Sequence, residues 1–425
     1  MGTSVTALRI LVVALRYPPY IFGGYELLAR DTVEGLRARG HHVEILCARG
    51  ERLRGIADVH AVLEPGLDGD EELFQAAFRA SNLERFQLHV LRLANVRRTA
   101  RVLHAVRPDV FFYLNLSLLS LGPLVAARLA RTPTLGLVCD PWPLNHWLRF
   151  WRERPDVKPL RRRLLEALWK PLRRAVRLEP MLAPSESLRA EFVADGLDPA
   201  GVERLPLAMS PEMQALGQNF PARRRAPGEP LRFLCASYLW DGKGVHVFLA
   251  AAVAAARAGA AIEVEIAGNG QAPYVARLEA LAQDPGLAGH VRFLGALSRA
   301  ELSAAMGRAH VLAFPSLWGE PYALATLEGM AHGLALLGSD AGGTPEQVEH
   351  GISGWIAPRG DVAAWSNAIE RLAGDEDLRF ALAAAGRARV FEKHTQGAYL
   401  DALEARLVKA AGDGPRWRAR LTEPR

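Results

Sequence analysis

The stretch FPSLWGEPYALATLEGMAHGLALLGSDAGGTPE, residues 314–346, decides the fold that this sequence predicts. An apolar run of strand length at 309–314 leads into it, and the turn that follows gives way to good helix formers at 322–330. A second apolar run at 335–338 then ends in a glycine turn. We therefore predict a strand, a helix and a second strand in this order, as in a parallel sheet covered by helices.

Two glutamates mark this unit. Glu320 lies in the turn and Glu328 on the predicted helix, so their carboxylates are expected roughly 12 Å apart along the helix direction. Pro321 suits a first helical residue, because its φ is fixed and its missing N–H would be unpaired there. Free backbone N–H groups are expected at the start of this helix, at Tyr322, Ala323 and Leu324. That helix end favours phosphate, and the carboxylates favour the hydroxyls of a sugar at Glu320 and of a ribose at Glu328.

The order Glu320, Glu328, Gly342-Gly343 and Glu346 resembles the signature of the retaining glycosyltransferase family 4, the glycosyl transferases of group 1. The resemblance covers almost the whole chain and is strongest over 231–358. It implies the GT-B fold, in which two Rossmann-like, doubly wound α/β domains face each other across a cleft. The plainer alternative is a surface helix with two solvated glutamates, and the complete motif in its expected context argues against it.

Three parts of the chain are expected. They are an N-terminal acceptor domain at 1–210, a C-terminal nucleotide-sugar donor domain at 211–390, and a last part at 391–425. By the resemblance, this last part holds a helix that crosses back to the first domain, followed by a flexible tail. A stretch rich in proline, glycine and arginine at 206–230 marks the boundary between the domains.

Composition restricts the class of protein. Half of the 425 residues are hydrophobic, which is typical of folded domains with large cores. The cysteines are odd in number and far apart, at Cys47, Cys139 and Cys235. They argue against a disulfide framework or a cysteine metal site and for a reducing compartment. The sequence has no run of 18 apolar residues, so we expect a cytoplasmic protein without a spanning helix.

Much of the formal charge of +6 is local. The segment 149–177 carries eleven Arg or Lys and three acidic residues, a net charge of +8, and tryptophans lie in and before it. Such a mixture is typical of a surface for an acidic acceptor, for a lipid-phosphate acceptor or for peripheral contact with a membrane. A solvated basic face is the competing interpretation. No recognised nucleic-acid module accompanies the segment, so nucleic acid is not expected as a partner.

In the first half, a glycine pair lies between a predicted strand at 9–15 and a predicted helix at 25–39. By the resemblance, Gly23 and Gly24 meet the donor diphosphate. The family commonly has a histidine at the end of a later strand, where this chain has Cys139, so the role of that histidine does not transfer. We expect Asp140, beside it, to face the ligand, while His146 is a candidate substitute for the histidine.

In the second half, the resemblance places several donor-binding residues at the ends of strands. Lys243, before a predicted helix, is a cation suited to a diphosphate. Many members of the family have an arginine six residues earlier, where this chain has Ser237, which retains only a hydroxyl donor. Gly268 ends a strand under the nucleotide, and Leu297 is expected beside the nucleobase.

Together these residues predict a hexosyltransferase that moves a sugar from a nucleotide-diphospho-sugar of the UDP or GDP type to a hydroxyl acceptor. The acceptor is a glycan, a lipid-linked molecule or a small molecule. The resemblance implies retention of configuration and the use of neither metal nor cofactor, with Glu320, Lys243 and Asp140 as the catalytic candidates. Two alternatives stay open: a GT-B epimerase or phosphorylase, and a non-catalytic protein that binds a nucleotide-sugar or an anionic surface.

Overall fold

A computed structural model describes residues 7–21, 23–67, 82–143 and 176–412, together with four positions between 159 and 167. The predictions for His146, for most of the basic segment and for the last thirteen residues fall outside the described residues. Within the described part of the chain, no helix is both long and apolar enough to cross a membrane. The chain divides into two units, one of 1–184, 188–205 and 400–425, and one of 185–187 and 206–399.

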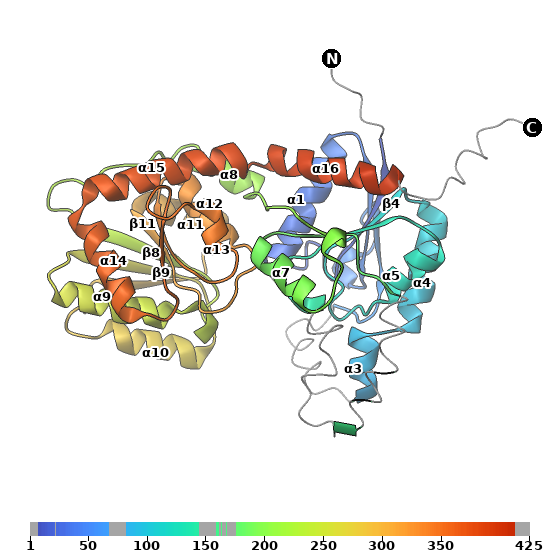
Figure 1. Ribbon diagram of the computed structural model, residues 1–425, viewed down its shortest axis with the longest axis horizontal. Helices are drawn as coiled ribbons and strands as arrows, with labels where there is room; N and C mark the ends of the chain where they lie inside the picture. The colour runs from blue at the N-terminus through green and yellow to red at the C-terminus, as the bar shows by residue number, and fades with distance from the viewer. Residues whose placement is uncertain are drawn as a thin grey trace, which may run out of the picture. The chain divides into compact units, whose positions relative to one another are not determined.

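The first unit is built on a parallel sheet of seven strands in the order β3-β2-β1-β4-β5-β6-β7. The strands are β1 (Arg9–Val13), β2 (His42–Ala48), β3 (Val59–Leu63), β4 (Val110–Tyr113), β5 (Thr134–Leu137), β6 (Met181–Ala183) and β7 (Val202–Arg204). The helices of this unit are α1 (Gly24–Ala38), α3 (Asn82–His89), α4 (Leu93–Val106), α5 (Gly122–Leu129), α7 (Glu186–Ala194) from Leu188 onward and α16 (Gln396–Gly412) from Leu400 onward. Helices α4 and α5 lie side by side (Figure 1).

The second unit has a parallel sheet of six strands in the order β10-β9-β8-β11-β12-β13. The strands are β8 (Leu231–Ala236), β9 (Ile262–Ala267), β10 (Val291–Gly295), β11 (Val311–Phe314), β12 (Ala335–Ser339) and β13 (Trp355–Ala357). The helices are α8 (Pro211–Gly217), α9 (Val245–Arg257), α10 (Ala272–Ala282), α11 (Arg299–Arg308), α12 (Leu324–Ala331), α13 (Thr344–Gln347), α14 (Val362–Gly374) and α15 (Glu376–Lys393). Two Rossmann-like α/β units with parallel sheets are therefore confirmed.

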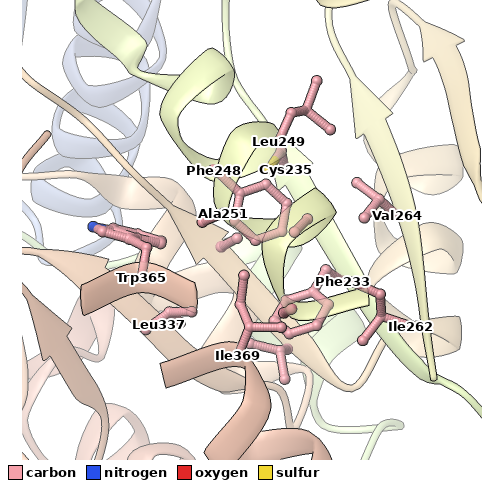
Figure 2. Packing of buried hydrophobic residues seen from close by; sticks show 14 of the residues in the cluster. Phe233, Cys235, Phe248, Leu249, Ala251, Ile262, Val264, Leu337, Trp365 and Ile369 are labelled. Atoms are coloured by element: carbon pink, nitrogen blue, oxygen red, sulfur yellow. The ribbon is translucent and has the colours of Figure 1, made fainter. Parts of the chain in front are cut away.

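The core of the second unit explains why its apolar sequence patterns form these elements. Phe233 on β8, Phe248 on α9 and Trp365 on α14 are buried and pack together under the sheet (Figure 2). Trp365 satisfies its one polar atom, because its indole N–H donates to the carbonyl of Pro358 at 3.0 Å. Burying side chains of this size contributes about 2–3 kcal/mol each, which fixes α9 and α14 on the same face of the sheet.

Each sheet has a point where the strand order reverses. It lies between β1 and β4 in the first unit and between β8 and β11 in the second. In open parallel sheets, ligands bind outside the carboxyl ends of the strands at such a point. The loops to examine are therefore those that follow β1 and β4, and those that follow β8 and β11.

Two predicted helix limits are wrong. Helix α12 begins at Leu324 instead of Pro321 or Tyr322. The residues before it stay extended because Gly343 N–H holds the carbonyl of Glu320 at 2.7 Å, and the Gln347 side chain holds that of Ala323 at 2.9 Å.

The second wrong limit concerns the helix predicted from 391 onward. It is broken into α15, which ends at Lys393, and α16, which begins at Gln396. At the break, the carbonyl of His394 accepts a hydrogen bond from Met209 N–H at 3.2 Å. This bond joins the break to a residue near the start of the second unit.

Candidate active site

The loops after β8 and β11 are joined at the point of strand reversal in the second unit. The N–H of Leu317 donates to the carbonyl of Gly242 at 2.8 Å. Gly244 has φ 64°, and a Cβ there would lie 2.0 Å from the carbonyl oxygen of Pro315. Only glycine allows this approach, so the two loops are fixed against each other by backbone.

Lys243 and Glu320, one from each of these loops, form an ion pair between Lys243 Nζ and Glu320 Oε1. The hydroxyl of Ser316 donates to the same carboxylate oxygen at 3.3 Å. The side chains of Lys243 and Glu320 are only 19% and 10% exposed, so little water screens them from each other. The two residues predicted to bind the diphosphate and the sugar thus lie in one place.

Helix α12 begins four residues after Glu320. Its N-cap residue, Ala323, provides no side-chain cap in the described structure, and the first N–H groups of a helix have no partner within the helix. Tyr322 is buried, and its hydroxyl lies 3.3 Å from His394 Nδ1. The ring is therefore packed inside the unit, and its backbone is the part that can serve an anion.

Glu328 lies in the second turn of α12, and its carboxylate is paired with a residue that the sequence did not single out. Arg299, the first residue of α11, donates from Nη2 to Oε1 at 2.7 Å and from Nη1 to Oε2 at 3.2 Å. Arg299 Nη2 also donates to the hydroxyl of Ser210 at 2.6 Å. A lone arginine at a helix start has no specific signature in one sequence, and only the fold brings it to Glu328.

The ends of β8, β9 and β10 also converge. Gly268 has φ 132°, and a Cβ there would lie 1.9 Å from the carbonyl oxygen of Ser237. Its N–H donates to the carbonyl of Gly295 at 2.7 Å. Gly268 therefore lets the loops pack closely, and half-buried Leu297 follows at the same edge.

The glycine pair after β12 has a structural role. Gly342 has φ 57°, and a Cβ there would lie 2.3 Å from the carbonyl oxygen of Glu320. Glu346, which completes the motif, accepts from the backbone N–H groups of Glu186 and Ser187, each at 2.9 Å. The glycines thus position the backbone of Glu320, while Glu346 holds the backbone at 186 and 187, which belong to the second unit.

In the first unit, Gly23 is the N-cap of α1 and Gly24 its first residue, on the connection that follows β1 beside the point of strand reversal. Gly23 N–H donates to Glu26 Oε2 at 2.9 Å. Its φ of −163° is open to any residue, and a Cβ would meet nothing within 4 Å. Nothing in the described structure requires a glycine at 23, and space on this side of the loop is what a bound ligand needs.

Asp140 lies at the end of β5 in a polar cluster of the first unit. Its Oδ1 accepts from Trp142 N–H at 2.8 Å, and Asn115 Nδ2 lies 3.5 Å from Oδ2. The N–H of Cys139 donates to the hydroxyl of Tyr25 at 2.5 Å. Burial raises the pKa of the Asp140 carboxyl to about 6, against the opposing effect of the Trp142 N–H. Burial also raises the pKa of the Cys139 thiol, so this side chain is a neutral group near pH 7.

Comparison with known families agrees with the geometry of both units. Residues 218–389 match the model of the glycosyl transferases group 1, and residues 23–208 match that of the glycosyl transferase 4-like domain. Together the two matches span most of the chain. The chain belongs to the group 1 glycosyltransferases.

Curated relatives of this group 1 chain act in glycan assembly. The amylovoran biosynthesis glycosyltransferase AmsK of Erwinia amylovora is 29% identical over 242 residues, which cover 56% of this chain and 58% of AmsK. A GDP-mannose-dependent alpha-(1-6)-phosphatidylinositol monomannoside mannosyltransferase of Mycobacterium tuberculosis is 32% identical over 171 residues, 39% of this chain and 44% of the relative. The matched segments thus span about half the length of these relatives.

Solved structures share the fold at low sequence identity. A glycosyltransferase from Rickettsia africae has a TM-score of 0.68 at 13% identity, covering 96% of this group 1 chain and 100% of its own. HepE of Anabaena, solved in complex with UDP, has a TM-score of 0.66 at 18% identity and covers 95% and 100%. These neighbours confirm the GT-B fold.

Proposed function

We propose that this protein is a retaining, metal-independent glycosyltransferase that moves a sugar from a nucleotide-diphospho-sugar to a hydroxyl acceptor. The observation that carries the proposal is the Lys243–Glu320 pair, which lies at the point of strand reversal and just before α12. A cation and a carboxylate at this point match the two ends of a sugar diphosphate. The second unit binds the donor, and the first unit binds the acceptor.

The diphosphate binds at Lys243 and at the first N–H groups of α12. An anion bound there pairs with the ammonium group of Lys243 in place of Glu320. The Glu320 carboxylate then accepts hydrogen bonds from sugar hydroxyls. As the anomeric C–O bond breaks, the nucleoside diphosphate leaves with the electron pair, and Lys243 and the helix end stabilise the growing charge. The acceptor oxygen bonds to the anomeric carbon from the same face, and its proton passes to the departing phosphate.

Glu328 binds the ribose hydroxyls, and its ion pair with Arg299 orients the Glu328 carboxylate. A carboxylate oxygen accepts more than one hydrogen bond, so a ribose hydroxyl can bind Glu328 alongside Arg299. HepE was solved with UDP-glucose, which supports a ribonucleotide donor for this fold.

Changing Arg299 to Leu should weaken binding of the donor nucleoside diphosphate about tenfold, because Glu328 loses its orientation and its counter-charge. Calorimetry with the ribonucleotide and with its 2′,3′-dideoxy analogue separates the causes. The wild type should prefer the ribonucleotide, and the variant should lose most of this preference. Equal weakening for both nucleotides would contradict a role through the ribose.

The acceptor hydroxyl is held in the first unit by Asp140 in its ionised form. The family's histidine is absent, and Cys139 offers a half-buried neutral thiol in its place, so the carboxylate is the strongest acceptor in the cluster. Asp140 therefore remains a catalytic candidate, and Cys139 does not.

The transfer rate should therefore fall as the pH drops through about 6, where Asp140 takes up a proton. Stability should change in the opposite direction. Because the folded pKa lies above the ordinary value of 3.8, ionisation of Asp140 opposes folding, and stability should be lost as the pH rises from about 4 through 6. Asp140→Asn should remove both effects in rate profiles and in melting curves, and an unchanged acidic limb would contradict the assignment.

Two observations favour a non-catalytic alternative, namely the cysteine at 139 and the serine at 237 where the family has a histidine and an arginine. A GT-B epimerase or phosphorylase would act on the nucleotide-sugar without a hydroxyl acceptor.

A thermal-shift screen of UDP, GDP, ADP and their sugars identifies the donor by selective stabilisation. Incubation of that donor with candidate acceptors should then yield a glycoside with retained anomeric configuration. Binding without any turnover would favour the non-catalytic alternative.

A further inference from the structure

A cluster of three arginines surrounds one carboxylate at the carboxyl ends of β2 and β3 in the first unit. Arg98 Nη1 lies 2.9 Å from Glu64 Oε1. Arg49 Nη2 and Arg92 Nη1 lie 3.4 Å and 3.9 Å from Oε2. Only the Arg98 contact is a strong hydrogen bond, so Arg49 and Arg92 keep most of their donors for another group.

Among the residues that the structure describes, the charges in this cluster do not balance, because three guanidinium groups and one carboxylate leave two positive charges. Arg92 is half-buried, and its Nε has no hydrogen-bond partner in the described structure. Burial and the neighbouring Arg98 lower the pKa of Arg92, while Glu64 opposes them. A buried cationic donor without a partner costs free energy unless an anion binds it.

The cluster is held on a rigid base. Buried Asn95 accepts from Glu64 N–H at 2.8 Å and donates to the Glu64 carbonyl at 2.7 Å, which joins the end of β3 to α4. Arg92 is the N-cap of α4, a helix of 14 residues with no acidic residue in its first turn. The positive end of the helix dipole therefore adds to the arginines instead of being neutralised.

The cluster lies on the ligand-binding edge of its sheet. Arg49 directly follows β2 and Glu64 directly follows β3, and these strands are the next two after β1, which leads to Gly23. Neighbouring strands are about 4.8 Å apart, so the strand ends that carry Arg49 and Glu64 lie roughly 5 and 10 Å along the edge from the end of β1. This distance suits an acceptor whose hydroxyl and anion lie at opposite ends of one sugar-sized ring.

We propose that Arg49, Arg92 and Arg98 bind a phosphate group carried by the acceptor. A phosphate monoester carries nearly two negative charges near pH 7, which matches the two uncompensated charges, and arginine forks fit its oxygens. Calling the ligand an acceptor rests on the proposed sugar transfer, whereas the phosphate site itself does not depend on it. A soluble sugar phosphate and the phosphate of a lipid headgroup share this chemistry.

The test measures binding of inorganic phosphate by calorimetry at constant ionic strength, using the full chain. The variant Lys243→Met serves as background, so that phosphate at the donor site does not contribute. Arg49→Gln and Arg92→Gln should weaken phosphate binding at least tenfold, while Arg97→Gln, at an exposed position of the same helix, should not. Arg49 is 59% exposed, so its replacement leaves the fold intact even where that of Arg92 does not.

Glucose 6-phosphate and vesicles containing phosphatidylglycerol then distinguish the two sources, and loss of either interaction in Arg49→Gln supports the site. Absence of phosphate binding in the background protein, or equal binding by Arg49→Gln and Arg97→Gln, would overturn it. The outcome is independent of the proposed function. Phosphate bound through Arg49 without sugar transfer would refute the transferase, and transfer only to neutral acceptors without phosphate binding would refute the phosphate site.

Discussion

Replacing Glu320 with Gln should lower turnover by about a hundredfold to a thousandfold. Glutamine keeps the shape of the side chain but loses the charge, and one of its two polar atoms no longer accepts hydrogen bonds. Hydrogen bonds to a charged acceptor contribute about 1.5–3 kcal/mol each, so loss of one strong or two weak ones, about 3–4 kcal/mol, gives an effect of this size. Because positive charge grows on the sugar ring as the leaving group departs, kcat should fall more than donor affinity.

A matched control separates catalysis from general damage. Glu349 is an exposed carboxylate of the same unit, and Glu349→Gln should leave kcat, donor affinity and the melting temperature unchanged. Circular dichroism should show the same fold for both variants. If Glu320→Gln retains turnover within threefold of the wild type, this carboxylate does not bind the reacting sugar and the transferase proposal fails.

The fold was predictable because its pattern is local and repeated. Strand β9 alternates apolar and acidic residues in the sequence IEVEIA, and β11 is the short apolar run VLAF. Both patterns are read from neighbouring residues and need no tertiary information. The start of α12 was not predictable in the same way. Pro321 does favour a helix start, but the carbonyls of Glu320 and Ala323 are held by Gly343 and Gln347, which are distant in the sequence.

The residues of the candidate site differ in the same way: some follow from the local sequence and others only from the fold. The two glutamates stand in a compound motif with fixed spacing, and Lys243 stands directly before a predicted helix, so one sequence suffices to select all three. Arg299 was missed, because only the packing of α11 against the neighbouring elements brings it to Glu328. The arginines of the phosphate cluster come from 49, 92 and 98, three positions whose proximity follows from strand order and from no local pattern.

Replacing Lys243 with Met should have the second large effect, and a double variant tells catalysis from stability. Methionine keeps the apolar stem but removes the ammonium group, so the departing diphosphate loses its side-chain cation in the second unit. We expect kcat/KM to fall by at least a hundredfold, with donor affinity also weakened. The single variant should also unfold more easily, because the nearly buried Glu320 keeps its charge without a partner.

Adding Glu320→Gln to Lys243→Met removes that unpaired charge. The double variant should therefore recover part of the lost stability in denaturant titrations, but none of the lost turnover. If only stability recovers, the ion pair matters to folding because each charge neutralises the other. Its two members then contribute to turnover separately, each through its own contact with the donor. If turnover recovers together with stability, the pair serves the fold only, and the residues that bind the diphosphate must lie elsewhere in the chain.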